Sequence, residues 1–168
     1  MGFSNIEILQ LPDISKLTFK RIHKDYLKVL ILTVLVIFFF LFLGVFLVST
    51  NVEEIGAFPY INYIYLLLAL LFLMLLTAFF IGFSRRKYVL RDKDITYKSG
   101  VLIKKITTVP FSRIQHVELD ESPISRVFKL ATISVFTAGD SSDDLVIKGI
   151  KKEEALKIKE FISEKING

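Results

Sequence analysis

The sequence predicts a two-helix transmembrane hairpin followed by a small α+β domain. Two long apolar runs without a charge, 29–48 and 60–83, lie in the first half of the chain. After Arg85 the chain changes to short segments rich in Val, Ile, Thr and Tyr, and it closes with one amphipathic helical segment. We therefore expect three parts: a cytoplasmic flank at 1–28, the hairpin at 29–83, and a cytoplasmic domain at 85–168.

The two apolar runs are long enough to cross a bilayer. An α-helix rises about 1.5 Å per residue, so roughly 20 residues span a hydrocarbon core of about 30 Å. Apolar residues cover all sides of both predicted helices, and such runs are typical of membrane spans rather than of a buried pair in a soluble core. Neither run holds an Asp, Glu, Lys, Arg or His, the side chains that transport and proton relay usually require. The hairpin is therefore predicted to be an anchor.

Basic residues flank the hairpin on one side only, which predicts its orientation. The connecting loop 49–59 has no Lys or Arg and carries Glu53 and Glu54. Loops rich in Lys and Arg stay in the cytoplasm. The sequence thus predicts a multi-pass protein of the cell membrane with both termini cytoplasmic. The flanking basic residues are Lys16, Lys20, Arg21, Lys24 and Lys28 before the first run, and Arg85, Arg86, Lys87, Arg91 and Lys93 after the second.

The C-terminal part predicts a bent sheet or partial barrel. Ser99-Gly100 suits a tight turn between strands, 138–144 suits a longer loop, and Ser122–Leu130 is expected to be irregular or a short helical turn. A final helix over about Lys151–Ile166 has an apolar stripe that would cap the sheet. The predicted strands are Arg86–Leu90, Ile95–Lys98, Val101–Val109, Gln115–Asp120, Ala131–Thr137 and Leu145–Ile150.

Several spaced motifs over roughly 20–166 resemble one known family. They are Val109-Pro110 with Arg113-Ile114-Gln115-His116-Val117, Thr137-Ala138-Gly139 after a strand, and Glu154-Ala155 in the final helix. With the two spans before them, they resemble the YdbS-like family of bacterial membrane proteins with a pleckstrin-homology-like (PH-like) domain. The resemblance implies a PH-like partial β-barrel capped by a C-terminal helix. A full PH fold has seven strands and six are predicted here, so the seventh is expected from a break within Val101–Val109 or from Ser122–Leu130.

No catalytic, cofactor or metal site is predicted, and the chain is predicted not to be an enzyme. The absence of cysteine excludes disulfides, thiol catalysis and zinc–cysteine sites. His23 is predicted to be an interfacial residue of the basic flank and His116 to be structural, because no paired-histidine motif, nucleophile elbow or P-loop accompanies them. The acidic residues of 138–144 lack the alternating spacing and distant Glu of a calcium loop.

The net charge of +5 lies wholly in the C-terminal half, where 17 basic residues face 12 acidic ones. A basic domain beside a bilayer favours anionic lipid as a partner, and without an aromatic–basic platform nucleic acid is not predicted. Lys104 and Lys105 are adjacent on a predicted strand, so they should point to opposite faces and cannot both join one patch. Arg85–Lys87 can equally serve only to set topology. The candidate lipid-surface contacts are Arg85, Arg86, Lys87, Lys98 and Arg113.

These features favour a non-enzymatic, membrane-anchored PH-like interaction module in a membrane protein complex. Its protein partner would be a membrane protein with related PH-like domains or a second copy of the chain. The partner would meet an exposed strand edge or an open end of the barrel. The alternative is a membrane-surface domain that responds to anionic lipid. A transporter or enzyme is less well supported, because the sequence shows neither intramembrane ionisable groups nor a reactive constellation.

Overall fold

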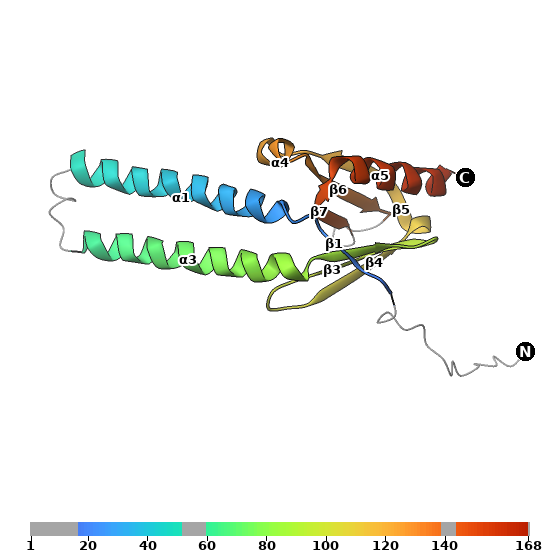
Figure 1. Cartoon of the computed structure of the whole chain (residues 1–168), viewed down its shortest axis with the longest axis horizontal. Coiled ribbons are helices and arrows are strands. Elements are labelled where there is room, and N and C mark those ends of the chain that lie inside the picture. The colour runs from blue at the N-terminus through green and yellow to red at the C-terminus, as the bar shows by residue number, and fades with distance from the viewer. Residues whose placement is uncertain (1–16, 52–59, 139–143, 168) are drawn as a thin grey trace, which may run out of the picture.

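The computed structural model describes residues 17–51, 60–138 and 144–167 (Figure 1). Most of the connecting loop 49–59, and residues 139–143 of the predicted loop at 138–144, lie outside the described residues. The elements in chain order are β1 (Lys20–Arg21), α1 (Tyr26–Asn51), α3 (Ile61–Arg85), β2 (Lys87–Leu90), β3 (Asp94–Ser99), β4 (Lys105–Pro110), η2 (Phe111–Arg113), β5 (Ile114–Asp120), α4 (Pro123–Val127), β6 (Leu130–Thr137), β7 (Leu145–Lys151) and α5 (Lys152–Asn167).

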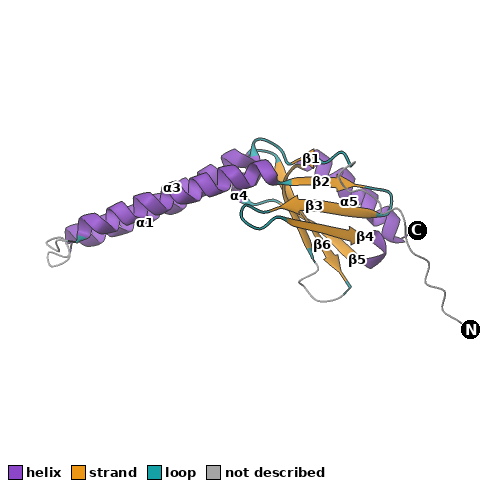
Figure 2. Ribbon diagram, turned by 90° about the horizontal axis from the view of Figure 1, so that it is seen from below, coloured by secondary structure: helices purple, strands orange, loops and turns teal. Residues whose placement is uncertain are grey.

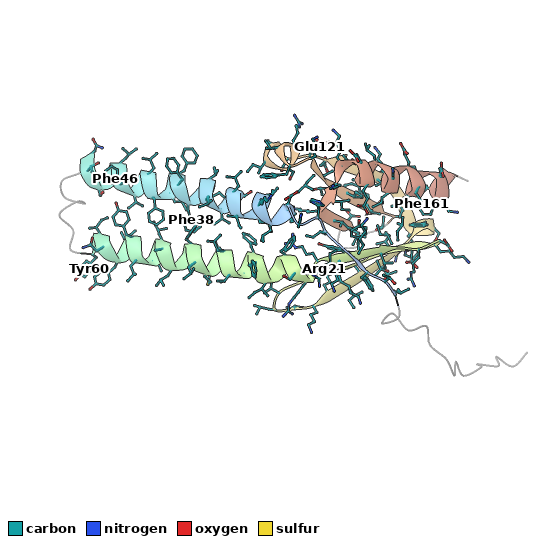
Figure 3. All side chains as sticks on the ribbon, in the orientation of Figure 1. Arg21, Phe38, Phe46, Tyr60, Glu121 and Phe161 are labelled. Atoms are coloured by element: carbon teal, nitrogen blue, oxygen red, sulfur yellow. The ribbon has the colours of Figure 1, made fainter. Side chains whose placement is uncertain are left out.

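The two apolar runs form α1 and α3, which lie side by side and antiparallel (Figures 1 and 2). They contain 26 and 25 residues and are both long and apolar enough to cross a membrane. Phe38 points towards α3, where its ring centroid is 5.1 Å from that of Phe72 (Figure 3). Phe39 and Phe40 remain more than half exposed, as side chains that face lipid would be. The predicted hairpin is confirmed.

Two antiparallel sheets and a helix make up the domain at the end of the hairpin. The strand orders are β1-β2-β3-β4 and β5-β6-β7, and α5 packs against the second sheet (Figure 2). The stripe of α5 predicted to be apolar is buried at Ala155, Ile158 and Ile162. Their neighbours in the core include Ile95 and Ile133, which are fully buried. The predicted PH-like barrel with a capping helix is confirmed.

The seventh strand comes from neither of the predicted sources. It is β1, which precedes the hairpin in sequence and pairs with β2 through Lys20 opposite Tyr88 and Arg21 opposite Lys87. The predicted source Ser122–Leu130 holds the short helix α4, as the helical-turn prediction had it, and only Leu130 joins a strand. A two-residue strand is too short for its hydrophobic period to be recognised, so β1 left no signal in the sequence.

The predicted strand Val101–Val109 is shorter than expected, because β4 begins only at Lys105. Gly100 has φ +112, and a Cβ there would lie 1.8 Å from the carbonyl oxygen of Ile103. This left-handed turn, which the Ser99-Gly100 pair predicts, folds residues 101–104 back as a loop. Val101 contacts α3, since a Cβ at Gly82 would lie 2.9 Å from its Cγ2.

Both helices are fixed to the domain at their base. Tyr26, at the start of α1, is buried against Gly149 of β7, where a Cβ would lie 2.4 Å from the Tyr26 Cγ. The His23 amide donates to the Gly149 carbonyl at 2.8 Å. At α3, a single residue, Arg86, separates the helix from β2. The domain therefore lies directly at the end of the hairpin where α1 begins and α3 ends.

Candidate functional site

A basic hollow of about 400 Å³ opens where α3 passes into the sheet. Three neighbouring segments form its lining. They are the end of α3 at Arg85, the start of β2 at Lys87, and the turn at Gly100 that leads the chain back to β4. The lining holds five basic side chains, two serines and no carboxylate. The lining residues are Ser84, Arg85, Lys87, Lys98, Ser99, Gly100, Lys104, Lys105 and Ile106.

The cations of the basic hollow face one another rather than acidic partners. Lys87 lies directly opposite Lys98 across β2 and β3, an arrangement of like charges that costs stability in a sheet. The Lys98 Nζ is 3.8 Å from the ring centroid of Phe19, a cation–π contact that leaves its charge in place. Within residues 17–51, 60–138 and 144–167, no carboxylate forms an ion pair with any of the five. An anion between them would relieve the repulsion.

The structure brings together three of the five predicted contacts. Arg85, Lys87 and Lys98 line the basic hollow. Arg86 instead turns towards α1, where its Nη1 donates to the Tyr26 hydroxyl at 3.4 Å. Arg113 lies in η2 and lines a separate groove beside β4.

The expectation that Lys104 and Lys105 cannot share a patch is wrong. Both line the basic hollow. The alternation of faces applies to residues within a strand, and Lys104 belongs to the loop that precedes β4. The signal that could have found this is Gly100, since a left-handed turn at that position breaks the alternation.

A second cavity of about 480 Å³, which we call the paired cleft, lies between the base of α1, α4 and the start of α5. Its charges are mixed, and Glu121, which lies beside α4 and α5 in Figure 3, is one of its three acidic residues. The Glu121 carboxylate lies 2.7 Å from the Lys152 Nζ and 3.8 Å from the Arg126 Nε. The lining residues are His23, Asp25, Glu121, Arg126, Phe128, Lys129, Lys151, Lys152 and Glu153.

A third hollow, a groove of about 340 Å³, runs along β4 and includes Arg113 and Thr137. β4 is the last strand of its sheet, so among the described strands it pairs only with β3. Thr137 is buried, and its Oγ1 has no hydrogen-bond partner among the described residues. The β4 groove thus combines a strand edge with a buried hydroxyl group.

A small polar cluster holds β1 against the domain. The Tyr88 hydroxyl donates to Glu154 of α5, and the Lys20 Nζ lies 2.6 Å from the same carboxylate oxygen. Burial and the neighbouring Glu154 raise the pKa of Tyr88. Burial alone would raise the pKa of Glu154, but the hydrogen bonds from Lys20 and Tyr88 outweigh it and hold that pKa below its usual value. The cluster therefore needs an ionised Glu154.

The two histidines lie apart and have local contacts. The His23 Nδ1 is 3.4 Å from an Asp25 carboxylate oxygen. His116 stacks on Phe136 with ring centroids 4.5 Å apart, and more than half of its side chain is exposed. The part of the chain that the structure describes contains no group of three or more His, Cys, Asp or Glu that could hold a metal ion.

Comparison with known proteins places the chain in a family. The Bacterial PH domain family matches residues 26–166, which include both spans, the strands β2 to β7 and all but the last residue of the capping helix. The chain belongs to the Bacterial PH domain family. Together with the two candidate spans, this makes it a bacterial membrane protein with a PH domain.

Two relatives come from Bacillus subtilis (strain 168), and each is 29% identical to this chain. UPF0699 transmembrane protein YdbT matches over 99 residues, which are 58% of this chain and 20% of YdbT. UPF0699 transmembrane protein YdbS matches over 92 residues, which are 53% of this chain and 56% of YdbS. The chain thus spans about half of YdbS and a fifth of YdbT, and the resemblance to YdbS-like membrane proteins is confirmed. No solved structure matches the chain.

Proposed function

We propose that this protein is a non-enzymatic, membrane-anchored module whose PH domain binds anionic phospholipid headgroups in the basic hollow. One observation carries the proposal: five basic side chains without a carboxylate partner among the described residues surround one hollow. That hollow lies at the end of a helix that can cross the membrane. Each Lys or Arg near an anionic membrane surface contributes about 1 kcal/mol, so a converged set favours anionic over neutral lipid.

The proposed orientation rests on the basic residues that flank the two spans. Both termini and the PH domain lie in the cytoplasm, because the basic residues flank the hairpin and the connecting loop has none. The chain has no cysteine, so single cysteines can report the side of the membrane. A membrane-impermeant maleimide added to intact cells should label Glu54→Cys and should leave Glu164→Cys unlabelled until the cells are opened. Labelling of Glu164→Cys in intact cells would reverse the orientation.

Thermal stability in the presence of lipid tests headgroup binding. A ligand that binds the folded state raises its unfolding temperature. Unfolding of the full chain in neutral detergent can be followed by circular dichroism. Added phosphatidylglycerol should raise the unfolding temperature more than added phosphatidylcholine does. Replacing Lys87, Lys98 and Lys104 by Ser should abolish the difference between the two lipids.

The matched control removes the same charge elsewhere. Lys148, Lys157 and Lys159 lie on β7 and α5 and line neither the basic hollow nor the paired cleft. Their replacement by Ser should leave the preference for phosphatidylglycerol intact. An equal loss in both triple variants would show that net charge and not the basic hollow sets the preference, and would refute the proposal.

A second candidate function, a protein interface, is favoured by the β4 groove. An edge strand can accept an extended segment of another chain through main-chain hydrogen bonds. The proposed occupant is a strand of a membrane protein with a related PH domain. This choice is supported by two different transmembrane proteins of one organism that share sequence with this chain.

A substitution that places a lysine on the edge strand β4 can separate the two proposed functions. Ile106 lies on β4 and lines both the β4 groove and the basic hollow, and about half of its side chain is exposed. Ile106→Lys should block strand pairing, so a related PH-domain protein should no longer copurify from native membranes. Anionic lipid binding should not fall, because the substitution adds a cation to the basic hollow. Val146→Lys, on β7 of the other sheet, is the control and should keep the partner. Unchanged copurification with Ile106→Lys would refute the β4 interface.

A further inference from the structure

The loop between β3 and β4 exposes two large apolar side chains at its tip. Leu102 and Ile103 are 95% and 83% exposed. No other large apolar side chain with a described exposure reaches these values, and the lipid-facing residues of α1 and α3 are at most 66% exposed. Exposed leucine and isoleucine of this kind, side by side on one loop, mark a surface that meets an apolar partner.

The contact between this loop and α3 sets the level of the tip relative to the membrane. Val101 packs on Gly82, which lies within the predicted span 60–83 and one turn before the end of α3. Leu102 and Ile103 follow Val101 directly, and the loop runs back along the last turns of α3 in Figure 1. The tip therefore lies at the level where the helix enters the bilayer and not at the level of the sheets.

The residues around the tip have the chemistry of a membrane interface. Lys104 and Lys105 follow the apolar pair, and Arg85 lies at the end of the adjacent helix. Long basic side chains can keep their charged ends among headgroups while apolar neighbours enter the acyl region. Amphipathic elements of this kind bury their apolar side about 5–10 Å into the boundary between headgroups and acyl chains.

We propose that Leu102 and Ile103 insert into the bilayer beside α3 as an apolar wedge, a third membrane contact in addition to the two spans. The occupant of this surface is the lipid bilayer itself. Burial of the wedge fixes the tilt of the PH domain, so that the basic hollow opens towards the headgroup layer. The wedge does not depend on the headgroup preference proposed above, because apolar burial also takes place in a neutral bilayer.

Tryptophan fluorescence can test the wedge, because the chain has no tryptophan of its own. The full chain with Leu102→Trp is reconstituted in vesicles of phosphatidylcholine alone, with and without bromine atoms on the acyl chains. The indole should emit at shorter wavelength than in water and should lose most of its emission to the brominated lipid. Iodide added to the solution should have little effect on it.

Glu164→Trp is the matched control. Glu164 is exposed on α5, near Phe161 at the end farthest from the hairpin (Figure 3). Its indole should be quenched by iodide and unaffected by brominated lipid. If Leu102→Trp responds as Glu164→Trp does, the wedge is refuted, while headgroup binding measured with phosphatidylglycerol would still stand. If Leu102→Trp is quenched by brominated lipid but phosphatidylglycerol is not preferred, the wedge stands and the headgroup proposal fails.

Discussion

The basic hollow and the paired cleft are both lined by charged side chains, but they differ in how many of their cations have an acidic partner. The paired cleft holds four Lys or Arg and three Asp or Glu, and Glu121 forms ion pairs with two of its cations. The basic hollow holds five Lys or Arg and no Asp or Glu. The charges of the paired cleft are therefore largely balanced within the protein, and we propose that an anionic headgroup balances those of the basic hollow.

This difference shows why a count of basic residues is a poor guide to a binding site. A cation that already has a carboxylate partner gains little from a lipid phosphate, since one pairing replaces another. Lys87 and Lys98 lie opposite each other on two strands and repel each other, and an anion between them would relieve that repulsion. The location of cations without a carboxylate partner, and not the total charge of +5, is therefore the basis of the lipid site that we propose.

Charge reversal should separate the cavities most strongly. Lys87→Glu with Lys98→Glu changes the local charge by four units, which at about 1 kcal/mol per charge weakens phosphatidylglycerol binding on the order of 1000-fold. The cross-strand pair remains one of like charges, so the fold should suffer little further. Arg126→Glu with Lys152→Glu, at the two cleft cations that Glu121 already pairs, should change the affinity far less in the same lipid titration. Equal losses would remove the distinction between the cavities.

The turn that shapes the basic hollow should be sensitive to a single methyl group. Gly100→Ala forces a Cβ into the Ile103 carbonyl at a left-handed φ, which should cost about 1–3 kcal/mol and displace Lys104. Gly44→Ala in α1 is the control, because no atom lies within 4 Å of the new Cβ. The unfolding temperature in detergent should therefore be lower for Gly100→Ala than for wild type, and it should not be lowered by Gly44→Ala. Similar unfolding temperatures for both would show that the turn does not hold the loop.

Removal of the central carboxylate should make the paired cleft resemble the basic hollow. Glu121→Gln frees Lys152 and Arg126 from their partner. A gain of about 1 kcal/mol from one released charge corresponds to roughly fivefold tighter binding of phosphatidylglycerol. The gain should persist when the basic hollow is neutralised at Lys87 and Lys98. No gain in either background would mean that cleft cations do not reach the lipid surface.

Low pH should reduce the stability of the domain by protonating Glu154, and not through the residues of the basic hollow. The folded pKa of Glu154 lies below its unfolded value, so its contribution to stability is present above about pH 4.5 and is lost as the pH falls through the folded pKa. Glu154→Gln should flatten the decline in unfolding temperature below about pH 5, with an effect under about 1 kcal/mol because the carboxylate is partly exposed. An identical acid profile in the variant would show that the cluster with Lys20 and Tyr88 is not linked to folding.

The sequence predicted those parts of the fold that have a local pattern. The uncharged runs gave the hairpin, and the apolar stripe that includes Ile158 and Ile162 gave the capping helix. Three residues of the basic hollow, Arg85, Lys87 and Lys98, were found because they flank a span or a turn.

The remaining features depend on contacts between distant segments. β1 is stabilised by Tyr88 and Glu154, which lie 68 and 134 residues further along the chain than Lys20. In the paired cleft Glu121 forms an ion pair with Lys152, and the strands β6 and β7 lie between these two residues in the sequence. Lys104 was assigned to the wrong face because the strand was extended through a loop. In the first two cases tertiary contacts override the local pattern on which a prediction from sequence rests, whereas the loop that holds Lys104 follows from the local turn at Gly100.

The central claim is that the basic hollow, and not the overall charge, selects anionic lipid. Native mass spectrometry of the full chain, released from detergent after exposure to equal amounts of phosphatidylglycerol and phosphatidylcholine, counts the lipids bound to each variant. Wild type and the Lys148, Lys157 and Lys159→Ser control should retain phosphatidylglycerol in excess. The Lys87, Lys98 and Lys104→Ser variant should carry the two lipids equally. An excess of phosphatidylglycerol on that variant, equal to that of wild type, would contradict the account.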